Sequence, residues 1–561
     1  MATDKIEIFC VNLGRHIAVE GGESLDKLAS RLADELGFEP ICARVNNKSD
    51  DLSYAIYAPK HVEFVGLDSA LGRRVYTRSL CMMLYRAASL EIEGCSLKIE
   101  HSISRGHFCR LSVKDSQLVD ITPDLLNRLT RRLREMHEDN IPFRRHLQVT
   151  GEVKALFRRE GLEEKVVLLD TTSEFYTSYY TLRDTADSYY GPLAPSTRFI
   201  GVFALHPYHD GFLLMGPDPA DLSKPIQPKP QEKLFKAFTD YLKFNRIIRV
   251  STVGDLNRAV RSRKTPELIN VAEAMHDKYL GRISDEIAMR NREGSARIVL
   301  LAGPSSSGKT TTNKRLAIQL MTNLLIPKLI SMDDYFIDRE HTPRDEAGDY
   351  DFEHLHALDL DRFNSDLKRL LAGETINLPT YSFELGRRVE KERPLSLGPK
   401  DVLLIEGIHG LNPELTYNLN PNDVFKLYVS ALTTLTIDDH NWISTNDNRL
   451  IRRIVRDHKY RHISALETLR RWPSVQRGEE RWIFPYQENA DAMFNSSLIF
   501  EIGVMKLYAE PLLREVPHNA VQYAEAYRLL KLLGYFLPIG AEQIPTTSLL
   551  REFLGGSSFR Y

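Results

Sequence analysis

The sequence predicts a multidomain protein, with α+β architecture in its front half and an α/β domain with a mainly parallel sheet in its C-terminal half. Three observations support this prediction. The chain has 561 residues, more than one ordinary domain of ~100–200 residues. Two hairpin-like strands, a helix and further strands are predicted within residues 1–68. An apolar strand, a glycine-rich loop and a helix follow one another at 297–320, an order typical of α/β domains.

The first segment is predicted to form a small β-grasp module. Ser24 is a suitable N-cap for a helix whose apolar face continues until Gly37 ends it. Strands are predicted around this helix, at residues 4–12, 16–19, 42–45 and 62–65. The stretches ARVNNKSDDLSYAI and VEFVGLDSALGRRVYTRS resemble the TGS domain at the start of threonyl-tRNA synthetases. This resemblance implies a TGS-like domain at residues 1–68.

The next segment, at residues 121–169, is similar to the part that follows the TGS domain in those synthetases. Thr122 is predicted to cap a helix with Pro123 at its first position. The arginines on this helix form either an RNA-binding surface or a solvated face, and the acidic residues around them favour the solvated face. The synthetase editing domain carries an H-x-x-x-H pair, but the corresponding residues 77–88 contain no histidine. Editing activity is therefore not implied.

Composition excludes several classes of protein. The formal net charge is −2, so no global basic surface favours nucleic acid. The N-terminus lacks the apolar core of a signal peptide, and no run approaches the ~18 apolar residues of a membrane helix. All five cysteines lie within the first 109 residues, and none forms a C-x-x-C pair. These features predict a soluble cytoplasmic protein with reduced thiols.

The glycine-rich loop carries the strongest functional signal. Residues Gly303–Thr310 match G-x-x-x-x-G-K-S/T between a predicted strand, Ile298–Ala302, and a helix. This context identifies a phosphate-binding loop (P-loop) rather than a chance glycine-serine turn. Its backbone N–H groups and helix N-terminus would bind phosphate, Lys309 would reach the β- and γ-phosphates, and Thr310 would bind Mg²⁺. The predicted nucleotide-binding residues are Gly303, Pro304, Ser305, Ser306, Ser307, Gly308, Lys309, Thr310 and Thr311.

Two further predicted strands end in carboxylates. The stretch PKLISMDDYF contains Asp333 and Asp334, and DVLLIEGIHGLNP reaches Glu406 after four apolar residues. The carboxyl ends of neighbouring parallel strands face bound phosphates, so these groups are candidates for accepting a proton or holding Mg²⁺. For the aspartate pair, an acidic helix cap is the alternative.

A predicted helix at 449–462 places Arg449, Arg453 and Arg456 at i, i+4 and i+7. Such a row can neutralise the charge of a phosphoryl group during its transfer. A solvated charged face is the alternative for this helix.

These motifs together resemble the uridine kinase and phosphoribulokinase family of P-loop kinases over about residues 297–503. The resemblance implies catalytic roles for Asp333, Lys309 and Arg456, with Asp334 as the alternative to Asp333. It implies metal binding by Thr310, Glu406 and Asp333. It implies substrate contacts for Asp351 in YDFEHLHALD, for Tyr381, Phe383 and Arg388 in LPTYSFELGRR, and for Arg453.

Two departures from the family pattern concern the acceptor. Gly386 stands where uridine-cytidine kinases carry a histidine, and Ile463 or a neighbour stands in place of a lid arginine. The predicted domains are a TGS-like β-grasp (1–68), a synthetase-like α+β domain (69–225), a helical connector (226–292), a P-loop kinase (293–510) and a C-terminal helical segment (511–561).

The sequence therefore predicts an ATP-dependent nucleoside kinase that uses ATP and Mg²⁺ and phosphorylates a nucleoside 5′-hydroxyl. Two alternatives stay open. One is an RNA-binding or translation-linked regulatory NTPase, with RNA as a partner of the N-terminal domains. The other is a P-loop kinase that acts on a sugar phosphate or another small alcohol. The sequence does not determine the oligomeric state or the role of the N-terminal domains.

Overall fold

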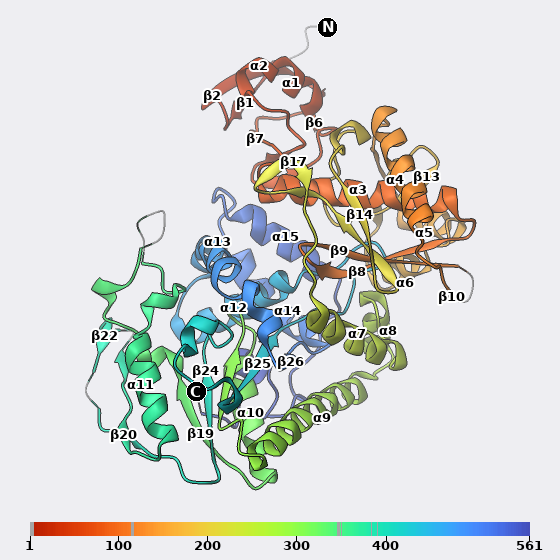
Figure 1. The fold of residues 1–561 in the computed structure, drawn as a ribbon. Coiled ribbons are helices and arrows are strands. Elements are labelled where there is room, and N and C mark those ends of the chain that lie inside the picture. Colours follow the sequence, from red (N-terminus) through yellow and green to blue (C-terminus); the bar gives the residue numbers. More distant parts are fainter. Residues whose placement is uncertain are drawn as a thin grey trace.

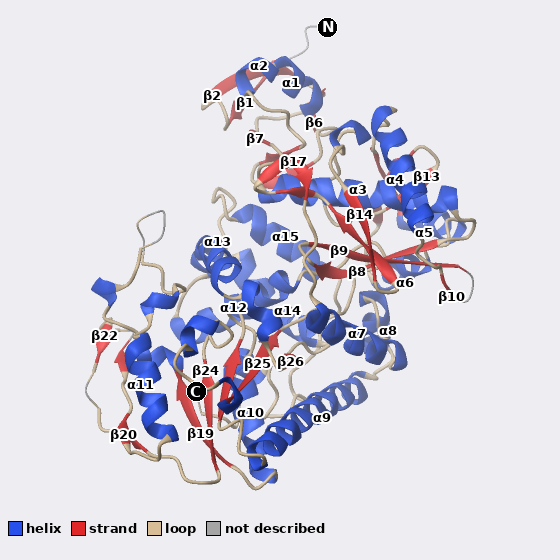
Figure 2. Ribbon diagram, in the orientation of Figure 1, coloured by secondary structure: helices blue, strands red, loops and turns tan. Residues whose placement is uncertain are grey.

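The computed structural model describes residues 5–113, 117–344, 348, 350–382, 384–389 and 391–560. Figure 1 shows a small N-terminal module at the top and the C-terminal half gathered around a central sheet at the bottom. The protein is a multidomain α/β molecule in which helices surround several separate sheets (Figure 2).

The N-terminal module contains a five-stranded sheet of order β2-β1-β7-β4-β5, in which β1 and β7 are parallel. Ser24 caps the first helix by accepting a hydrogen bond from Lys27 N, and Gly37 ends the second with φ +69°. The predicted hairpin, helix and later strands are thus confirmed, whereas their relation to the TGS domain stays a prediction. The elements are β1 Lys5–Cys10, β2 Arg15–Glu20, β3 Glu23–Ser24, α1 Leu25–Arg31, α2 Ala33–Leu36, β4 Cys42–Val45, β5 Lys48–Asp50, β6 Ala55–Ile56 and β7 His61–Val65.

The second region packs two sheets against the long helix α3 (Ala70–Glu91), most of which is buried. One sheet has the order β10-β9-β15-β14, with β8 beside β9, and the other has the order β11-β12-β13. Helix α4 (Pro123–Glu138) has Thr122 as its N-cap and Pro123 as its first residue, as predicted, and its apolar face is buried. The remaining elements are β8 Ser96–Ile103, β9 Gly106–Val113, β10 Gln117–Leu118, β11 Arg144–Val149, α5 Thr150–Arg159, α6 Glu163–Thr171, β12 Tyr176–Leu182, β13 Thr185–Asp187, β14 Ala204–Tyr208, β15 Gly211–Met215, β16 Pro217–Asp218 and β17 Asp221–Pro225.

The C-terminal half is organised by a sheet of five parallel strands in the order β19-β24-β18-β25-β26. Its strands are β18 Ile298–Ala302, β19 Ile326–Ser331, β24 Asp401–Glu406, β25 Val424–Ser430 and β26 Ala492–Asn495. The first strand has the predicted bounds. An all-parallel sheet with its central strands buried is consistent with a P-loop kinase, since helices must cover both faces.

Helices cover this sheet and complete its edges. They are α7 Glu232–Ile247, α8 Val253–Arg261, α9 Thr265–Arg292, α10 Lys309–Thr322, α11 Leu360–Leu371, α12 Thr445–Arg461, α13 Ala465–Trp482, α14 Glu501–Arg514, α15 Tyr523–Gly534 and α16 Arg551–Leu554. Short hairpins form the outer segment near α11, from β20 Ile376–Asn377, β21 Tyr381–Ser382, β22 Arg387–Arg388 and β23 Pro394–Leu395.

One apolar core joins segments that the sequence treated separately. Leu256 of α8 and Ile269 of α9 belong to the same buried cluster as Val299 of β18 and Leu529 of α15. Residues of α8, α9 and α15 therefore share one apolar core with the five-stranded parallel sheet.

The front half contacts the C-terminal half through a buried charge cluster. The Lys165 ammonium lies 2.9 Å from both Asp187 and Asp438, and His440 lies 2.8 Å from Asp187. All four side chains are at most 3% exposed. A buried charge is costly unless it is paired. Moving the two halves apart would leave these charges without their partners, so the cluster favours the observed arrangement.

Among the described residues, none of the helices has the length and apolar character needed to cross a bilayer. The five cysteines are free thiols, in agreement with the sequence expectation.

Candidate active site

The P-loop follows β18 and leads into α10, as the sequence predicts. A side chain at Gly303 would place its Cβ 2.0 Å from the Val429 carbonyl oxygen, so the close approach of β25 requires glycine there. Gly308 has φ +82° and is the N-cap of α10. The first bond within α10 runs from Thr312 N to Gly308 O, at 3.0 Å. The N–H groups before Thr312 therefore lie at the anion-binding end of the helix.

Lys309 lies at the centre of the site. Its Nζ donates to the carbonyl oxygens of Gly303, at 2.9 Å, and Pro304, at 3.0 Å. Burial lowers the pKa of this ammonium, while the nearby carboxylates of Glu406 and Asp333 act in the opposite direction. One cation thus shares the field of both predicted carboxylates.

The two carboxylates come together because their strands are neighbours in the sheet. Glu406 ends β24 and lies in register with Leu301 of β18 and Ser331 of β19. Asp333 follows β19 in a short 3₁₀ turn, Met332–Tyr335. Both groups therefore reach the carboxyl edge of the sheet beside the P-loop, where phosphates bind in α/β folds.

Thr310 and Glu406 form a compact pair of oxygen donors. The Thr310 hydroxyl donates to Glu406 Oε1 at 3.1 Å. Within the part of the chain that the structure describes, Glu406 Oε2 is buried and has no hydrogen-bond partner. Burial raises the pKa of Glu406 to about 7, with Lys309 opposing the shift.

These donors fit Mg²⁺, a hard cation that prefers oxygen ligands. No group of three or more His, Cys, Asp or Glu side chains that could hold a metal occurs among the described residues. Mg²⁺ is usually held by one or two carboxylates together with substrate phosphates, so an all-protein cage is not required.

Asp333 and Asp334 have different surroundings. Asp334 Oδ2 accepts a hydrogen bond from Arg393 at 2.8 Å. The Asp333 side chain reaches solvent, but protein atoms surround its carboxylate on the other sides. This partial desolvation raises the pKa of Asp333, and the positive charge of Lys309 opposes the increase. Asp333 is thus accessible to a substrate and influenced by the P-loop lysine.

Helix α12 supplies arginines of two kinds. Arg453 donates to the Ser305 hydroxyl at 2.9 Å and contacts Asp457, and Arg456 pairs with Asp457 at 2.9 Å. Arg449 is fully buried, where it donates to Ser305 O at 2.8 Å and pairs with Glu479. The predicted row of three guanidinium groups is therefore not formed. Arg449 is buried and holds the backbone of the P-loop, so only Arg453 and Arg456 remain as candidates for contact with phosphate.

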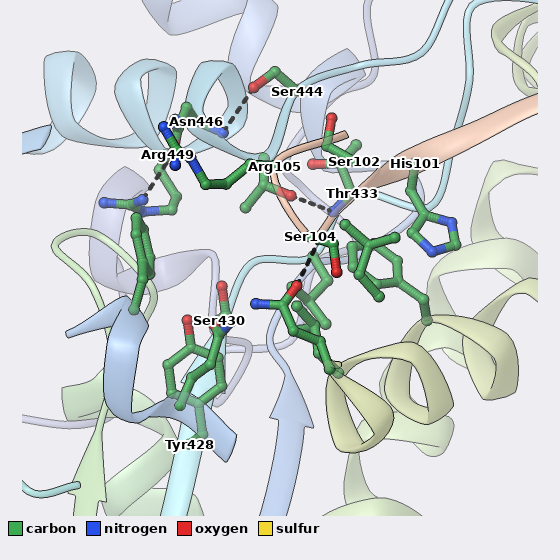
Figure 3. Close-up of a pocket in the computed structure, with 18 of the residues that line it drawn as sticks. His101, Ser102, Ser104, Arg105, Tyr428, Ser430, Thr433, Ser444, Asn446 and Arg449 are labelled. Carbon is green, nitrogen blue, oxygen red and sulfur yellow. Dashed lines mark hydrogen bonds between the residues drawn. The ribbon is translucent and has the colours of Figure 1, made fainter. Parts of the chain in front are cut away.

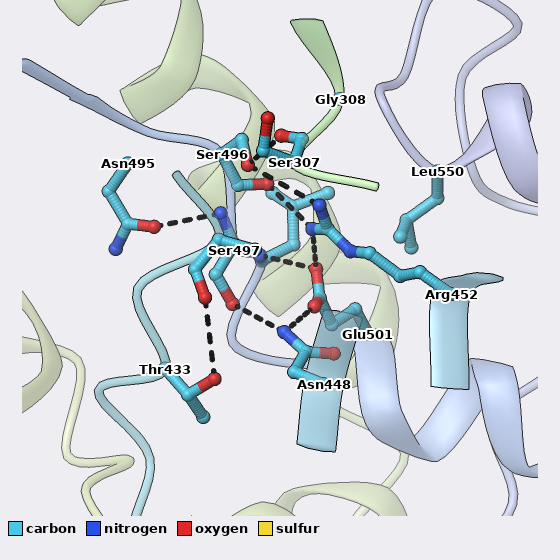
Figure 4. Close-up of polar contacts among 12 residues, drawn as sticks. Ser307, Gly308, Thr433, Asn448, Arg452, Asn495, Ser496, Ser497, Glu501 and Leu550 are labelled. Carbon is cyan, nitrogen blue, oxygen red and sulfur yellow. Dashed lines mark hydrogen bonds and ion pairs between the residues drawn. The ribbon is translucent and has the colours of Figure 1, made fainter. Parts of the chain in front are cut away.

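Arg452 also supports the loop, although the sequence did not single it out. Its guanidinium is fully buried, lies 2.6 Å from Glu501 and donates to Ser306 O at 3.4 Å and Ser496 O at 2.9 Å. Figure 4 shows this cluster directly beneath Ser307 and Gly308. In the sequence Arg452 stands between Ile451 and Arg453, and an arginine in such a place is usually solvent-exposed. The local pattern therefore did not predict that Arg452 is buried.

The predicted acceptor residues lie apart from the P-loop in sequence. Asp351 Oδ1 accepts from Glu353 N at 3.2 Å. Tyr381 is 7% exposed and packs near Phe336, with ring centroids 5.6 Å apart. Arg388 binds Asp359 at 2.8 Å and the main-chain oxygens of Phe336 and Tyr335. The predicted contact Phe383 lies outside the described residues.

Other charged groups at the site were missed from the sequence. Burial raises the pKa of Glu353 to about 7, with Arg453 opposing, and Glu353 lies in the same stretch as Asp351. Arg461, in the last turn of α12, lies within electrostatic reach of Asp333. Glu479 accepts a hydrogen bond from Ser305 N at 2.9 Å, and Glu552 accepts from Thr311 N at 3.1 Å. Neither Glu479 nor Glu552 was assigned a role from the sequence, because both reach the site from segments distant in the chain.

A separate cavity of about 590 Å³ lies where the front half meets α12. Figure 3 shows Ser102, near the end of β8, with Ser104 and Arg105 from the β8–β9 turn, and Asn446 and Arg449 from α12. The P-loop lysine and the two site carboxylates do not line this cavity.

Comparisons with known proteins agree with this geometry. Residues 298–499 match the model of the phosphoribulokinase / uridine kinase family. The chain is 30% identical over 201 residues to a uridine kinase of Brevibacillus brevis, covering 36% of this chain and 85% of that protein. It is 30% identical over 195 residues to a uridine kinase of Staphylococcus aureus, covering 35% of this chain and 84% of that protein.

A solved structure described as a possible uridine kinase from Bacillus stearothermophilus covers 38% of this chain and 99% of its own length. Its sequence identity is 20% and its TM-score 0.25, which is too low to support a conclusion. The sequence relatives are sufficient, since the match spans 85% and 84% of their length. The region that matches the family model, residues 298–499, contains the P-loop, both strand-end carboxylates and α12. Through these residues the chain belongs to the phosphoribulokinase / uridine kinase family, and its C-terminal half is a P-loop kinase domain.

Proposed function

We propose that the protein is an ATP-dependent nucleoside kinase, which transfers the γ-phosphoryl group of ATP to a nucleoside 5′-hydroxyl. The observation that carries the proposal is the convergence of Lys309, Asp333 and Glu406 at the carboxyl edge of the parallel sheet. The relatives described as uridine kinases support a nucleoside as the acceptor.

The chemistry follows from the position of each group. Asp333 accepts the proton of the 5′-hydroxyl while the hydroxyl oxygen forms a bond to the γ-phosphorus of ATP. The bond from the γ-phosphorus to the β–γ bridging oxygen breaks, and ADP leaves. Lys309, Arg453 and Arg456 neutralise the charge on the transferring group.

Thr310 and Glu406, with Asp333 beside them, would hold Mg²⁺. When bound, this ion neutralises charge on the β- and γ-phosphate oxygens. Asp351, Tyr381, Phe383 and Arg388 are proposed to bind the nucleoside, as the family resemblance implies. Ordered hydrogen bonds around Arg388 would hold this part of the site in a defined shape.

The test is ADP release by the purified full-length protein with MgATP and a panel of acceptors. The panel contains uridine, cytidine, thymidine and purine nucleosides, together with a sugar phosphate and glycerate. We expect at least one nucleoside to stimulate ADP release above the rate with water alone. Stimulation by the sugar phosphate or glycerate alone would replace the nucleoside with that acceptor, and no stimulation would remove the kinase proposal.

Asp333→Asn and Asp334→Asn form a matched pair for the catalytic step. Loss of a general base costs about 10²–10⁴-fold in rate, so Asp333→Asn should lower kcat by that factor and leave the Kd for ATP unchanged. Asp334→Asn removes an equal charge next to it, but one paired with Arg393, and should leave most of kcat. The reverse order would assign the base to Asp334.

RNA binding by the front half stays a prediction. On α4, Arg128 and Arg132 lie 3.0 Å and 2.7 Å from Glu91, which reduces the free positive charge of this helix. The measurement is tRNA binding to the full chain at several salt concentrations, because phosphate contacts weaken steeply as salt rises. No binding at low salt would exclude an RNA partner.

A further inference from the structure

The C-terminal segment of the chain lies against the P-loop. Glu552, in α16, accepts two hydrogen bonds at one oxygen, from Thr311 N at 3.1 Å and from the Thr311 hydroxyl at 2.6 Å. Thr311 comes directly after the predicted Mg²⁺-binding Thr310, and its N–H belongs to the first turn of α10. A protein carboxylate therefore occupies donors at the anion-binding end of this helix.

The backbone of the segment is firmly held beside the loop. Leu549, Leu550 and Phe553 are fully buried, and a Cβ at Gly308 would lie 2.7 Å from the Leu549 side chain. Lys459 of α12 donates to Leu554 O at 2.6 Å. Phe553 lies under the Arg452 guanidinium, 5.1 Å from it. Glu552 is thus delivered to Thr311 by an anchored segment and not by a chance surface contact.

The Glu552 side chain itself is half-buried and flexible by type, unlike the apolar residues around it. Its carboxylate also lies in the field of Lys309 and of Glu406. A nucleotide phosphate and this carboxylate carry the same sign and require the same donors. Both cannot bind Thr311 together, whereas rotation of one side chain would release the donors without moving α16.

We propose that Glu552 is a built-in competitor for nucleotide phosphate, which holds the Thr311 donors until ATP displaces it. The proposal rests on ATP being the phosphoryl donor. It makes the C-terminal segment a determinant of ATP affinity, a role outside the P-loop motif. It also predicts that the competition concerns phosphate and not the adenosine part of the nucleotide.

The test is isothermal titration of full-length protein with ATP and, separately, with adenosine. Glu552→Gln removes the charge with little change in shape, and Glu552→Ala removes the acceptor. Because charged hydrogen bonds compete strongly for the Thr311 donors, either variant should lower the Kd for ATP by about tenfold or more. Affinity for adenosine should not change. Glu542→Gln, an exposed carboxylate on the same segment, is the matched control and should behave as the wild type.

The outcomes separate this inference from the proposed function. If wild type and both Glu552 variants bind ATP with equal Kd, the competition is refuted and the kinase proposal stands. A higher Kd for ATP in the Glu552 variants than in the wild type would also refute the competition, because it would show that the carboxylate assists ATP binding. If the Glu552 variants bound ATP and adenosine more tightly by the same factor, the competition would not concern the phosphates, and the proposal would be refuted. Absence of ATP binding in every variant would refute both proposals.

Discussion

Arg452 offers a direct test of how the P-loop is supported. In Arg452→Met the Glu501 carboxylate loses the cation 2.6 Å away, and both side chains are at most 1% exposed. Removing one partner of a buried ion pair costs about 3–5 kcal/mol, because the remaining charge is uncompensated. The bonds to Ser306 O and Ser496 O are lost as well. We therefore expect the free energy of unfolding to fall by about 3–5 kcal/mol.

The double variant Arg452→Met/Glu501→Gln separates the two contributions. It removes the uncompensated charge but keeps an amide that can accept the hydrogen bond from Leu498 N, 2.9 Å long in the native protein. The remaining cost is that of lost hydrogen bonds, about 1–2 kcal/mol. The double variant should therefore be more stable than Arg452→Met alone.

Urea unfolding followed by tryptophan fluorescence suits this measurement. The three tryptophans are at positions 442, 472 and 482, all in the C-terminal half. Arg470→Met is the matched control, because Arg470 is 59% exposed and pairs with Glu467 on the surface. It should cost under about 1 kcal/mol. If Arg452→Met costs no more than Arg470→Met, the reasoning about the buried pair is wrong.

Three further predictions test other parts of the molecule. Glu406→Gln should raise the Mg²⁺ concentration needed for half-maximal ADP release by about tenfold or more, and an unchanged Mg²⁺ titration would remove Glu406 from the metal site. Gly308→Ala should weaken ATP binding, measured by titration, because it forces a side chain into φ +82° and against Leu549; native affinity would contradict this. Burial acts to lower the pKa of His440, but Asp187 outweighs it and the pKa is raised. The protonated histidine thus stabilises the fold below its unfolded pKa of about 6.5, and this contribution is lost as pH rises through the folded value. As pH rises from about 6.5 through the folded pKa of His440, the urea midpoint of the wild type should fall. The midpoint of His440→Gln should not change over the same pH range.

Local patterns predicted where the P-loop strand and the neighbouring strand ends lie, whereas the roles of their side chains stay predictions. The strand Ile298–Ala302 has the predicted bounds, since an apolar run that ends at glycine is a strong local signal. Glu406 and Asp333 meet beside the P-loop because strand ends in a parallel sheet share one edge. In both cases the relevant information lies within a few residues of the chain.

Charge pairing was predicted less well. Arg449, Arg453 and Arg456 share a helical spacing, yet Arg449 is buried against Glu479, which is 30 positions away. Arg452 pairs with Glu501, 49 positions away. A helix shows the same spacing whether an arginine faces solvent, substrate or a buried carboxylate, so spacing alone could not assign these roles.

The sequence by itself determined the chemistry of this protein: a P-loop, two strand-end carboxylates and an arginine-rich helix, which together indicate phosphoryl transfer. Tertiary structure decided how that chemistry is supported and controlled. It placed Glu552 on Thr311, 241 positions away, and packed the flanking helices into one core with the sheet. The physical reason is that hydrogen-bond partners and burial depend on contacts between distant segments, which local spacing does not record.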